Sequence, residues 1–218
     1  MNIEEKAKTL ANYIDRLSDF KIVLPDIPIP YSHMGATITD AILQAGTTWE
    51  TVVKPRIQKL IKKYPDAKTT SGFFNLLKQI NINTLLDWND SDKPNRILKV
   101  ISLFLEEKIE TETDLKSWLN NDLNITKLKK LRGVKNKTAD YFKILSGIST
   151  SAVDRHLIEF INKAGIDISL NEYSEAREII NKTAEQKGIN KSLLDHSIWK
   201  YMSEKKGKRK LCKRGHSR

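Results

Sequence analysis

Apolar residues recur along most of the chain at the three- and four-residue spacing of an α-helix. Runs that alternate apolar and polar residues, as a half-buried strand would, are scarce. The pattern therefore predicts an all-α fold. The expected helices cover residues 2–18, 34–45, 49–63, 71–80, 94–107, 112–120, 124–131, 137–147, 154–164, 172–187 and 190–203.

Three prolines interrupt this helical pattern near the N-terminus. They stand at positions 25, 28 and 30, where each removes a backbone donor and restrains the residue before it. The stretch 23–31 is thus expected to be an extended linker. It separates the first helix from the helices that follow. That first helix has one apolar stripe: Ile3, Ala7, Leu10, Tyr13, Ile14 and Leu17.

The cysteine and glycine content excludes several kinds of site. Cys212 is the only cysteine among 218 residues, which excludes a disulfide framework and an iron-sulfur or zinc site built on cysteine clusters. The glycines form neither a dinucleotide-binding nor a P-loop spacing. We therefore expect no metal and no organic cofactor. The N-terminus does not resemble a signal peptide and no segment is apolar enough to span a membrane, so a soluble, cytoplasmic, nucleoid-associated protein is expected.

The formal net charge of +11 indicates a polyanionic partner such as nucleic acid. Residues 205–218 contain eight Lys or Arg and no acid, which leaves 11 − 8 = +3 for the other 204 residues. We predict that 204–218 form a basic, flexible tail. Its role stays open between a solvated end and an arm that binds phosphate.

A tight turn at residues 132–136 connects two of the predicted helices. Such a turn leaves backbone N–H groups pointing outward beside the positive end of the helix that follows, and this arrangement binds phosphate. Basic side chains surround the turn: Lys129, Lys130, Arg132 and Lys135. The alternative is an ordinary corner between two helices with a solvated basic rim.

Two linked motifs occur here. Leu131, Gly133, Val134, Lys137 and Ala139 form the first, and Val153, Asp154 and His156 form the second, with 17 residues from Lys137 to Asp154. Together they resemble the helix-hairpin-helix DNA glycosylases, the superfamily that includes endonuclease III and the 8-oxoguanine glycosylases. The chain lacks the cysteines of the endonuclease III cluster, and Lys135 stands where that family has a second hairpin glycine.

The resemblance implies a catalytic pair. Lys137 would attack the sugar C1′ as the damaged base departs, forming a Schiff base that permits β-elimination, and Asp154 would stabilise the positive charge that develops on the sugar. A position near a helix N-terminus and other cations favours the neutral, nucleophilic amine. Each residue has a simpler interpretation, since Lys137 would also suit a phosphate contact and Asp is a favoured N-cap.

The resemblance also implies DNA contacts and a substrate class. The expected DNA-binding residues are Lys129, Arg132, Gly133, Val134, Lys135, Asn136, Arg155 and His156. The Asp-Arg-His triplet at 154–156, with Leu194-Asp195 followed by Ile198-Trp199, is similar to the archaeal 8-oxoguanine glycosylases. An oxidised purine such as 8-oxoguanine is therefore the favoured base.

Residues of the base pocket are harder to choose. In the family a glutamine fills the gap left by the flipped base, but here the corresponding position is Gly46. The candidates are therefore Gln44, Thr47, Thr48 and Trp49. Trp199 and Tyr201 would suit stacking on an extruded base, and a place in the core is the alternative for at least one of them. His33 is expected to be structural.

We therefore expect two helical domains with a DNA groove between them. Residues 33–148 would form one domain that ends in the helix-hairpin-helix at 123–147, and residues 1–32 plus 149–203 would form the other. The expected partner is double-stranded DNA with a damaged or mispaired base, bound by a monomer. Two alternatives stay open: a monofunctional glycosylase acting on uracil, thymine mismatches or alkylated purines, and a non-catalytic DNA-binding module.

Overall fold

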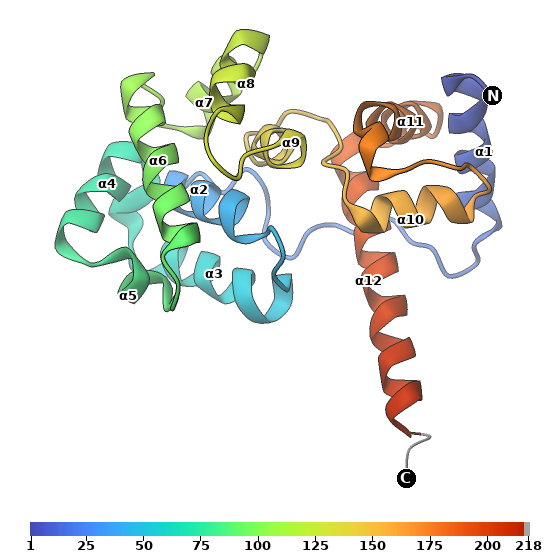
Figure 1. Ribbon diagram of the computed structural model, residues 1–218, viewed down its shortest axis with the longest axis horizontal. Helices are drawn as coiled ribbons and strands as arrows, with labels where there is room; N and C mark the ends of the chain where they lie inside the picture. Colours follow the sequence, from blue (N-terminus) through green and yellow to red (C-terminus); the bar gives the residue numbers. More distant parts are fainter. Residues whose placement is uncertain (216–218) are drawn as a thin grey trace. The chain divides into compact units, whose positions relative to one another are not determined.

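The computed structural model describes the backbone of residues 1–215 and the side chains up to Lys205, and within this range every regular element is a helix (Figure 1). The all-α prediction is confirmed. The helices are α1 (Ile3–Arg16), α2 (Met34–Leu43), α3 (Lys54–Lys63), α4 (Thr70–Gln79), α5 (Ile82–Leu86), α6 (Asp92–Glu106), α7 (Glu112–Trp118), α8 (Asp122–Lys129), α9 (Asn136–Leu145), α10 (Arg155–Lys163), α11 (Tyr173–Gln186) and α12 (Lys191–Gly215). A π-helical segment, η1 (Trp49–Val53), and two 3-10 segments, η2 (Pro65–Lys68) and η3 (Leu170–Glu172), complete the set. None of the helices within the described range combines the length and apolar character that crossing a membrane requires.

Most predicted helices occur within a few residues of their expected ends, with two differences. α5 was not predicted, because five residues are too few to show a helical period. α12 continues to Gly215, beyond the predicted end at 203. This extension consists mainly of Lys and Arg, which are good helix formers. It has no apolar stripe, so the hydrophobic pattern did not predict a helix there. Residues 204–218 were predicted to form a basic, flexible tail that binds phosphate or is simply solvated. The side chains of this tail lie mostly outside the described residues.

The chain divides into two compact units. Unit 1 comprises Met1–Asp26 with Ser149–Arg218, and unit 2 comprises Ile27–Ile148. Each unit has its own apolar core.

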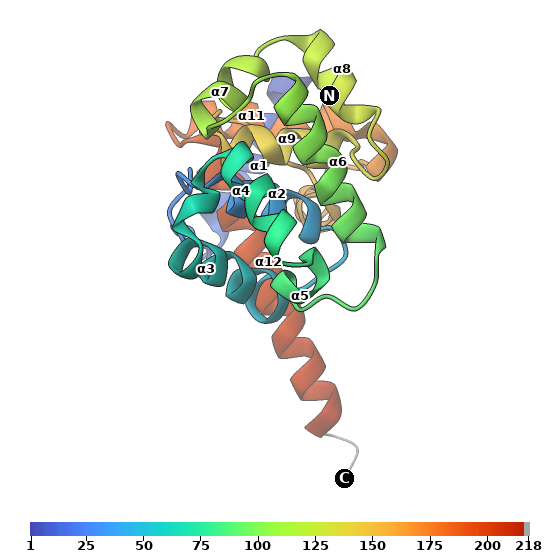
Figure 2. The same ribbon diagram turned by 90° about the vertical axis from the view of Figure 1, so that its left-hand side faces the viewer.

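Unit 2 is built around α2. All ten residues of this helix are buried, and it packs against α3, α4, α6 and α9 (Figures 1 and 2). A helix this apolar on every face is stable only when other helices surround it. Its sequence, MGATITDAIL, contains a single ionisable side chain, Asp40. That carboxyl group is therefore held in the core of unit 2.

His33 fixes the beginning of α2 and is structural, as expected. Its Nδ1 accepts a hydrogen bond from the Ala36 N–H at 3.1 Å, and its Nε2 lies 2.9 Å from the Tyr64 carbonyl oxygen. The buried Glu112 Oε1 accepts hydrogen bonds from the His33 N–H at 2.7 Å and from the Thr37 hydroxyl at 2.8 Å. The His33 ring thus caps the Ala36 N–H in the first turn of α2, and Glu112 ties the N-cap residue to that turn.

Unit 1 joins the N-terminal helix to the C-terminal part of the chain. α1 packs along α11, and α10 and α11 pack on α12. The Thr183 hydroxyl donates to the Ala7 carbonyl, and Lys6 pairs with Glu175. In the core, the Phe160 ring meets Tyr13, Phe20 and Tyr201.

Candidate nucleic-acid interface and catalytic residues

The turn between α8 and α9 has the geometry of a tight hairpin. The Val134 N–H donates to the Leu131 carbonyl at 3.0 Å, and Gly133 has a φ of +84°. A positive φ favours glycine, because a Cβ would crowd the backbone. Val134 is buried in the core of unit 2, whereas Arg132 and Gly133 are exposed. The hairpin is thus anchored by Val134 and presents its tip to solvent.

Lys135 occupies the position of the missing hairpin glycine without backbone strain. Its φ is −116° and its ψ is −170°, an extended conformation open to any residue. Lys135 is the N-cap of α9, and in the described structure no side chain caps that helix. The first turn of α9 contains no acidic residue, so the positive end of its dipole is not neutralised from within the helix.

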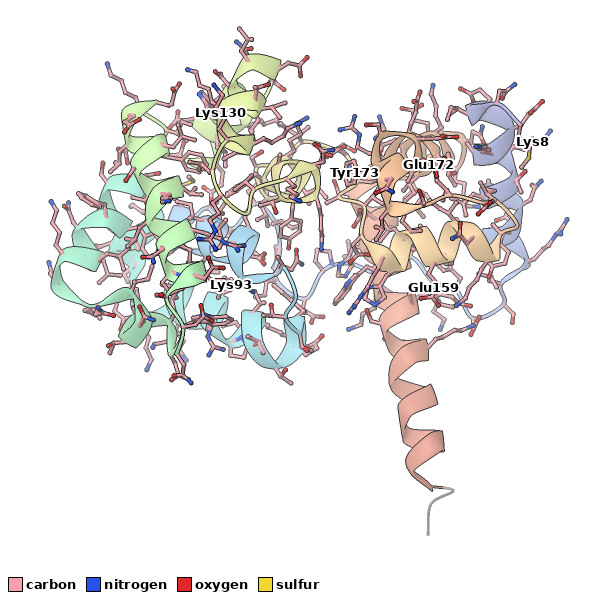
Figure 3. All side chains as sticks on the ribbon, viewed as in Figure 1. Lys8, Lys93, Lys130, Glu159, Glu172 and Tyr173 are labelled. Atoms are coloured by element: carbon pink, nitrogen blue, oxygen red, sulfur yellow. The ribbon has the colours of Figure 1, made fainter. Side chains whose placement is uncertain are left out.

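Basic side chains surround the turn. Lys129, Lys130, Arg132 and Lys135 are all exposed, and Lys129 Nζ donates to Asn136 Oδ1 at 2.9 Å. Figure 3 labels Lys130 at the end of α8. Most of the predicted DNA-binding residues of the hairpin thus lie at one exposed turn: Lys129, Arg132, Gly133, Lys135 and Asn136. Val134 is the exception, because its side chain is buried and its N–H is bonded to the Leu131 carbonyl.

Arg96 of α6 supports the hairpin, a role that the sequence did not indicate. Its guanidinium lies against Gly133, and its Nη2 donates to Asp92 Oδ2 at 2.6 Å. Asp92 also lies 3.6 Å from Arg132 Nη2. A shallow depression of about 290 Å³ adjoins this group, lined by Asp92, Asn95, Arg96, Leu98, Lys99 and Arg132. Two arginines thus share one carboxylate, which leaves a net positive charge beside the turn.

Lys137 lies in the first turn of α9 and is half-buried. Its positive charge acts on Asp40 of α2, lowering the pKa of that carboxyl group. The Tyr31 hydroxyl donates to Asp40 Oδ2 at 2.8 Å and the Tyr141 hydroxyl donates to the same oxygen at 2.9 Å. Burial nevertheless dominates and raises the pKa of Asp40 to about 7.

Asp40 and its two tyrosines were missed in the sequence analysis. The one available signal was an Asp in the middle of an otherwise apolar helix. A charged group at such a position is rarely buried without partners. The partners themselves come from the segment before α2 and from α9, and no sequence spacing connects them.

Asp154 is the N-cap of α10. Its Oδ1 accepts hydrogen bonds from the His156 N–H at 2.7 Å and the Leu157 N–H at 3.3 Å. The His156 ring nitrogen Nδ1 lies 3.4 Å from Oδ2. Asp154 and His156 are half-buried, whereas Arg155 is exposed. The predicted capping role is confirmed, and the same contacts fix the carboxylate in one orientation.

The pocket candidates from unit 2 follow the end of α2. Gln44 is its C-cap and is half-buried. Thr48 is exposed and precedes η1, and Trp49 packs against the core of unit 2. The role of each at a flipped base stays a prediction.

Lys93 of α6, labelled in Figure 3, holds this segment in place. Its Nζ donates to the carbonyl oxygens of Leu43 and Ala45, each at 2.6 Å. The ammonium also lies 5.1 Å from the centre of the Trp88 ring. Lys93 thus satisfies carbonyls at the end of α2 and stabilises the turn that leads to Thr48 and Trp49.

The aromatic candidates from unit 1 differ in burial. Tyr201 is only 9% exposed and its ring packs on Phe20 and Phe160, so it belongs to the core. Trp199 is half-buried at the edge of that core and stacks on His196, with ring centres 6.0 Å apart. Of the two, Trp199 retains an exposed surface.

Among the described residues, no group of three or more His, Cys, Asp or Glu side chains is arranged to hold a metal ion. The catalytic candidates fall in different units. Lys137 belongs to unit 2 with the hairpin, whereas Asp154, Arg155, His156 and Trp199 belong to unit 1.

Comparison with known proteins gives one match. Residues 28–203 match the model of a family described as a domain of unknown function, DUF8548. Neither the curated proteins nor the solved structures contain a significant match to the chain.

Proposed function

The chain belongs to the DUF8548 family, and we propose that it is a DNA glycosylase of base-excision repair with an associated lyase activity. In this proposal Lys137 is the nucleophile and Asp154 is the carboxylate that stabilises the developing positive charge. The observation that supports it most directly is the hairpin between α8 and α9, with its exposed tip and basic rim.

The hairpin suits a contact with the DNA backbone. Gly133 allows close approach, the first turn of α9 has no side-chain cap, and the cations around it attract phosphate without selecting a base. Backbone N–H groups recognise the phosphate alone, so the contact positions the duplex and leaves sequence unread. An enzyme that searches DNA for rare lesions needs a contact of this kind.

The proposed chemistry begins when the damaged nucleotide leaves the stack, because no side chain reaches C1′ in an intact duplex. The Lys137 amine attacks C1′ as the bond to the base breaks, and the resulting Schiff base permits β-elimination of the 3′ phosphate. Asp154 is well suited to stabilise the sugar, because its two backbone hydrogen bonds hold the carboxylate in place before the charge appears.

An oxidised purine is the proposed base. The support comes from the Asp-Arg-His triplet at 154–156 and the Leu194-Asp195 and Ile198-Trp199 pairs, which are similar to the archaeal 8-oxoguanine glycosylases. In the structure Trp199 keeps part of its ring exposed, as a stacking residue must.

A panel of duplexes tests the proposal. Each carries 8-oxoguanine, uracil, a thymine mismatch, thymine glycol or an abasic site, and is incubated with the wild type and with Lys137→Gln, Asp154→Asn and Lys8→Gln. Lys8 is an exposed lysine on α1 (Figure 3) and serves as the matched control. We expect strand cleavage at 8-oxoguanine by the wild type and Lys8→Gln, and none by the other two variants.

Borohydride trapping distinguishes the remaining outcomes. A covalent DNA adduct that Lys137→Gln abolishes supports the bifunctional enzyme. Base release that survives Lys137→Gln and is lost in Asp154→Asn would indicate a monofunctional glycosylase. DNA binding without base release from any duplex would instead indicate a binding module, and the proposal would be wrong.

A further inference from the structure

The segment that leads into Asp154 is buried although it forms no regular element. We call residues 149–153 the connector, since they join α9 of unit 2 to α10 of unit 1. Thr150 is 8% exposed, and the next three residues are less exposed still. An unpaired buried N–H is costly, so the backbone of such a segment needs partners from side chains. These partners show what holds the chain just before Asp154.

Two side chains of α12 bind the backbone of the connector. Asp195 Oδ2 accepts a hydrogen bond from the Ala152 N–H at 2.8 Å. The Ser192 hydroxyl accepts from the Thr150 N–H at 3.3 Å and donates to the Thr150 carbonyl at 3.0 Å. Ser192 and Asp195 are three residues apart in the helix, so they lie on the same face. One face of α12 therefore holds the connector at two points.

Side chains of the connector add further contacts. The Ser149 hydroxyl accepts a hydrogen bond at 3.2 Å from the N–H of Lys191, the first residue of α12. The Ser151 hydroxyl donates at 2.9 Å to Oδ1 of Asn181 in α11. Val153 is buried in the core of unit 1. All of these residues belong to unit 1, so the course of the connector is fixed within that unit.

Asp154 is thus held from both sides along the chain. The hydrogen bonds that its Oδ1 accepts from the His156 and Leu157 N–H groups orient the carboxylate relative to α10. The bond between Ala152 and Asp195, two residues before Asp154, ties the main chain to α12. Precise placement matters for catalysis, because a displacement of about 1 Å can cost on the order of a hundredfold in rate.

We propose that Asp195 is a positioning residue for base excision: by binding the Ala152 N–H it holds the Asp154 carboxylate where the positive charge of the sugar develops. It acts through Asp154, and its carboxylate takes no part in the chemical step. The inference rests on the proposed function, in which Asp154 stabilises that charge.

Packing between helices is the alternative source of this placement. α10 also packs on α12, as Figure 1 shows. That packing holds the helix that follows Asp154, whereas the connector holds the residues that precede it. If packing alone places Asp154, loss of the Asp195 side chain leaves the cap of α10 unchanged. The test therefore measures the cap directly.

The first measurement needs no DNA. A two-dimensional amide spectrum of the isotope-labelled full chain reports the His156 and Leu157 N–H groups, whose resonances depend on their bonds to the Asp154 carboxylate. In Asp195→Ala we expect both resonances to move toward those of unbonded amides, although the substitution is on another helix.

Ser197→Ala is the matched control. Ser197 is buried in α12, and its hydroxyl accepts a hydrogen bond from the Val23 N–H at 3.1 Å. Like Asp195→Ala, it removes an acceptor on α12 that serves the backbone of an irregular segment, but that segment does not lead to Asp154. The His156 and Leu157 resonances should therefore stay in place in Ser197→Ala.

The second measurement separates the excision rate from DNA binding. Single-turnover rates are measured with the damaged duplex that the wild type cleaves, and fluorescence anisotropy gives Kd for an undamaged duplex. Asp195→Ala should lower the rate at least about tenfold and change Kd less than about twofold, since the hairpin belongs to unit 2. Asp195→Asn keeps an oxygen that accepts from Ala152, so its rate should stay within about threefold of the wild type.

Ser192→Ala provides the test if Asp195→Ala does not fold. It removes both bonds to Thr150, and we expect changes in the same direction that are smaller, because the bond at Ala152 remains.

Unchanged His156 and Leu157 resonances in Asp195→Ala, with a shift confined to the connector, would overturn the proposal and leave Asp195 a structural residue. Equal effects in Ser197→Ala would also overturn it. So would a loss of rate in Asp195→Asn as large as that in Asp195→Ala, because the acceptor would then not be what matters. If the wild type excises no base, the proposed function fails, whereas the spectra still show whether Asp195 holds Asp154. The two proposals can therefore fail separately.

Discussion

The guanidinium of Arg96 lies directly against Gly133, so that a Cβ on this glycine would come within 2.4 Å of the Arg96 Nη1. Arg96 Nη2 donates to Asp92, so moving the guanidinium aside would break that ion pair. The hairpin conformation and the position of Arg96 are therefore coupled.

Gly133→Ala should destabilise the protein for two reasons. The positive φ costs about 1 kcal/mol for alanine, and the clash displaces Arg96 as well. Gly165→Ala is the matched control, because Gly165 has a φ of +82° and a Cβ there meets nothing within 4 Å. Urea unfolding should show a larger loss for Gly133→Ala, together with weaker DNA binding. Equal losses in the two variants would mean that Arg96 adjusts freely.

Two substitutions of Asp154 should show that its effects on stability and on activity are separate. Asp154→Asn keeps a good N-cap and should change the free energy of unfolding by less than about 0.5 kcal/mol, whereas Asp154→Ala should cost about 1 kcal/mol. Both variants should lose base excision, since both remove the charge. Thermal unfolding and an excision assay on the same samples measure the two effects. Full excision by Asp154→Asn would leave Asp154 with its capping role alone.

Asp40 should make stability depend on pH. Its folded-state pKa of about 7 lies above its ordinary value, so the folded state binds more protons than the unfolded state between about pH 4 and pH 7. The contribution is fully present at low pH and is lost as the pH rises through 7. Between pH 5 and pH 8 the wild type should lose on the order of 2 kcal/mol relative to Asp40→Asn. Urea unfolding at pH 5 and pH 8 measures the free energy of unfolding of both proteins. An equal change between the two pH values in the wild type and in Asp40→Asn would contradict this assignment.

The basic rim of the hairpin should determine how DNA binding depends on salt. Lys130→Gln and Arg132→Gln should each reduce the slope of log K against log salt by about 1, because each variant releases about one fewer counterion. Lys8→Gln, an exposed lysine of unit 1, should leave the slope unchanged. Fluorescence anisotropy with an undamaged duplex at several salt concentrations gives the slopes. Equal slopes for all three variants would place the DNA elsewhere.

Much of the fold was predictable because the relevant signals are local. The hairpin follows from a few consecutive residues that end one helix, require a glycine and begin another, and the α10 cap follows from Asp154 itself. Lys135 was the exception: it stands where the family has a glycine, yet within the turn only Gly133 has a positive φ.

The surroundings of the site were not predictable, because they depend on residues far apart in the chain. Arg96 meets Gly133, and Tyr31 and Tyr141 both meet Asp40, only after the helices of unit 2 have packed. No periodicity links such residues. The sequence showed that an Asp lies within an apolar helix, but the fold determines what surrounds it.

The division of the chain affects the order in which it folds during synthesis. Unit 2 is one continuous segment, so all of it emerges from the ribosome before α10 emerges. α1 is made before unit 2, yet its apolar stripe is buried against α11, which emerges much later. Closing so long a loop is slow, because its entropy is lost before any contact forms. The nascent chain therefore carries Ala7, Leu10 and Ile14 uncovered until α11 has emerged.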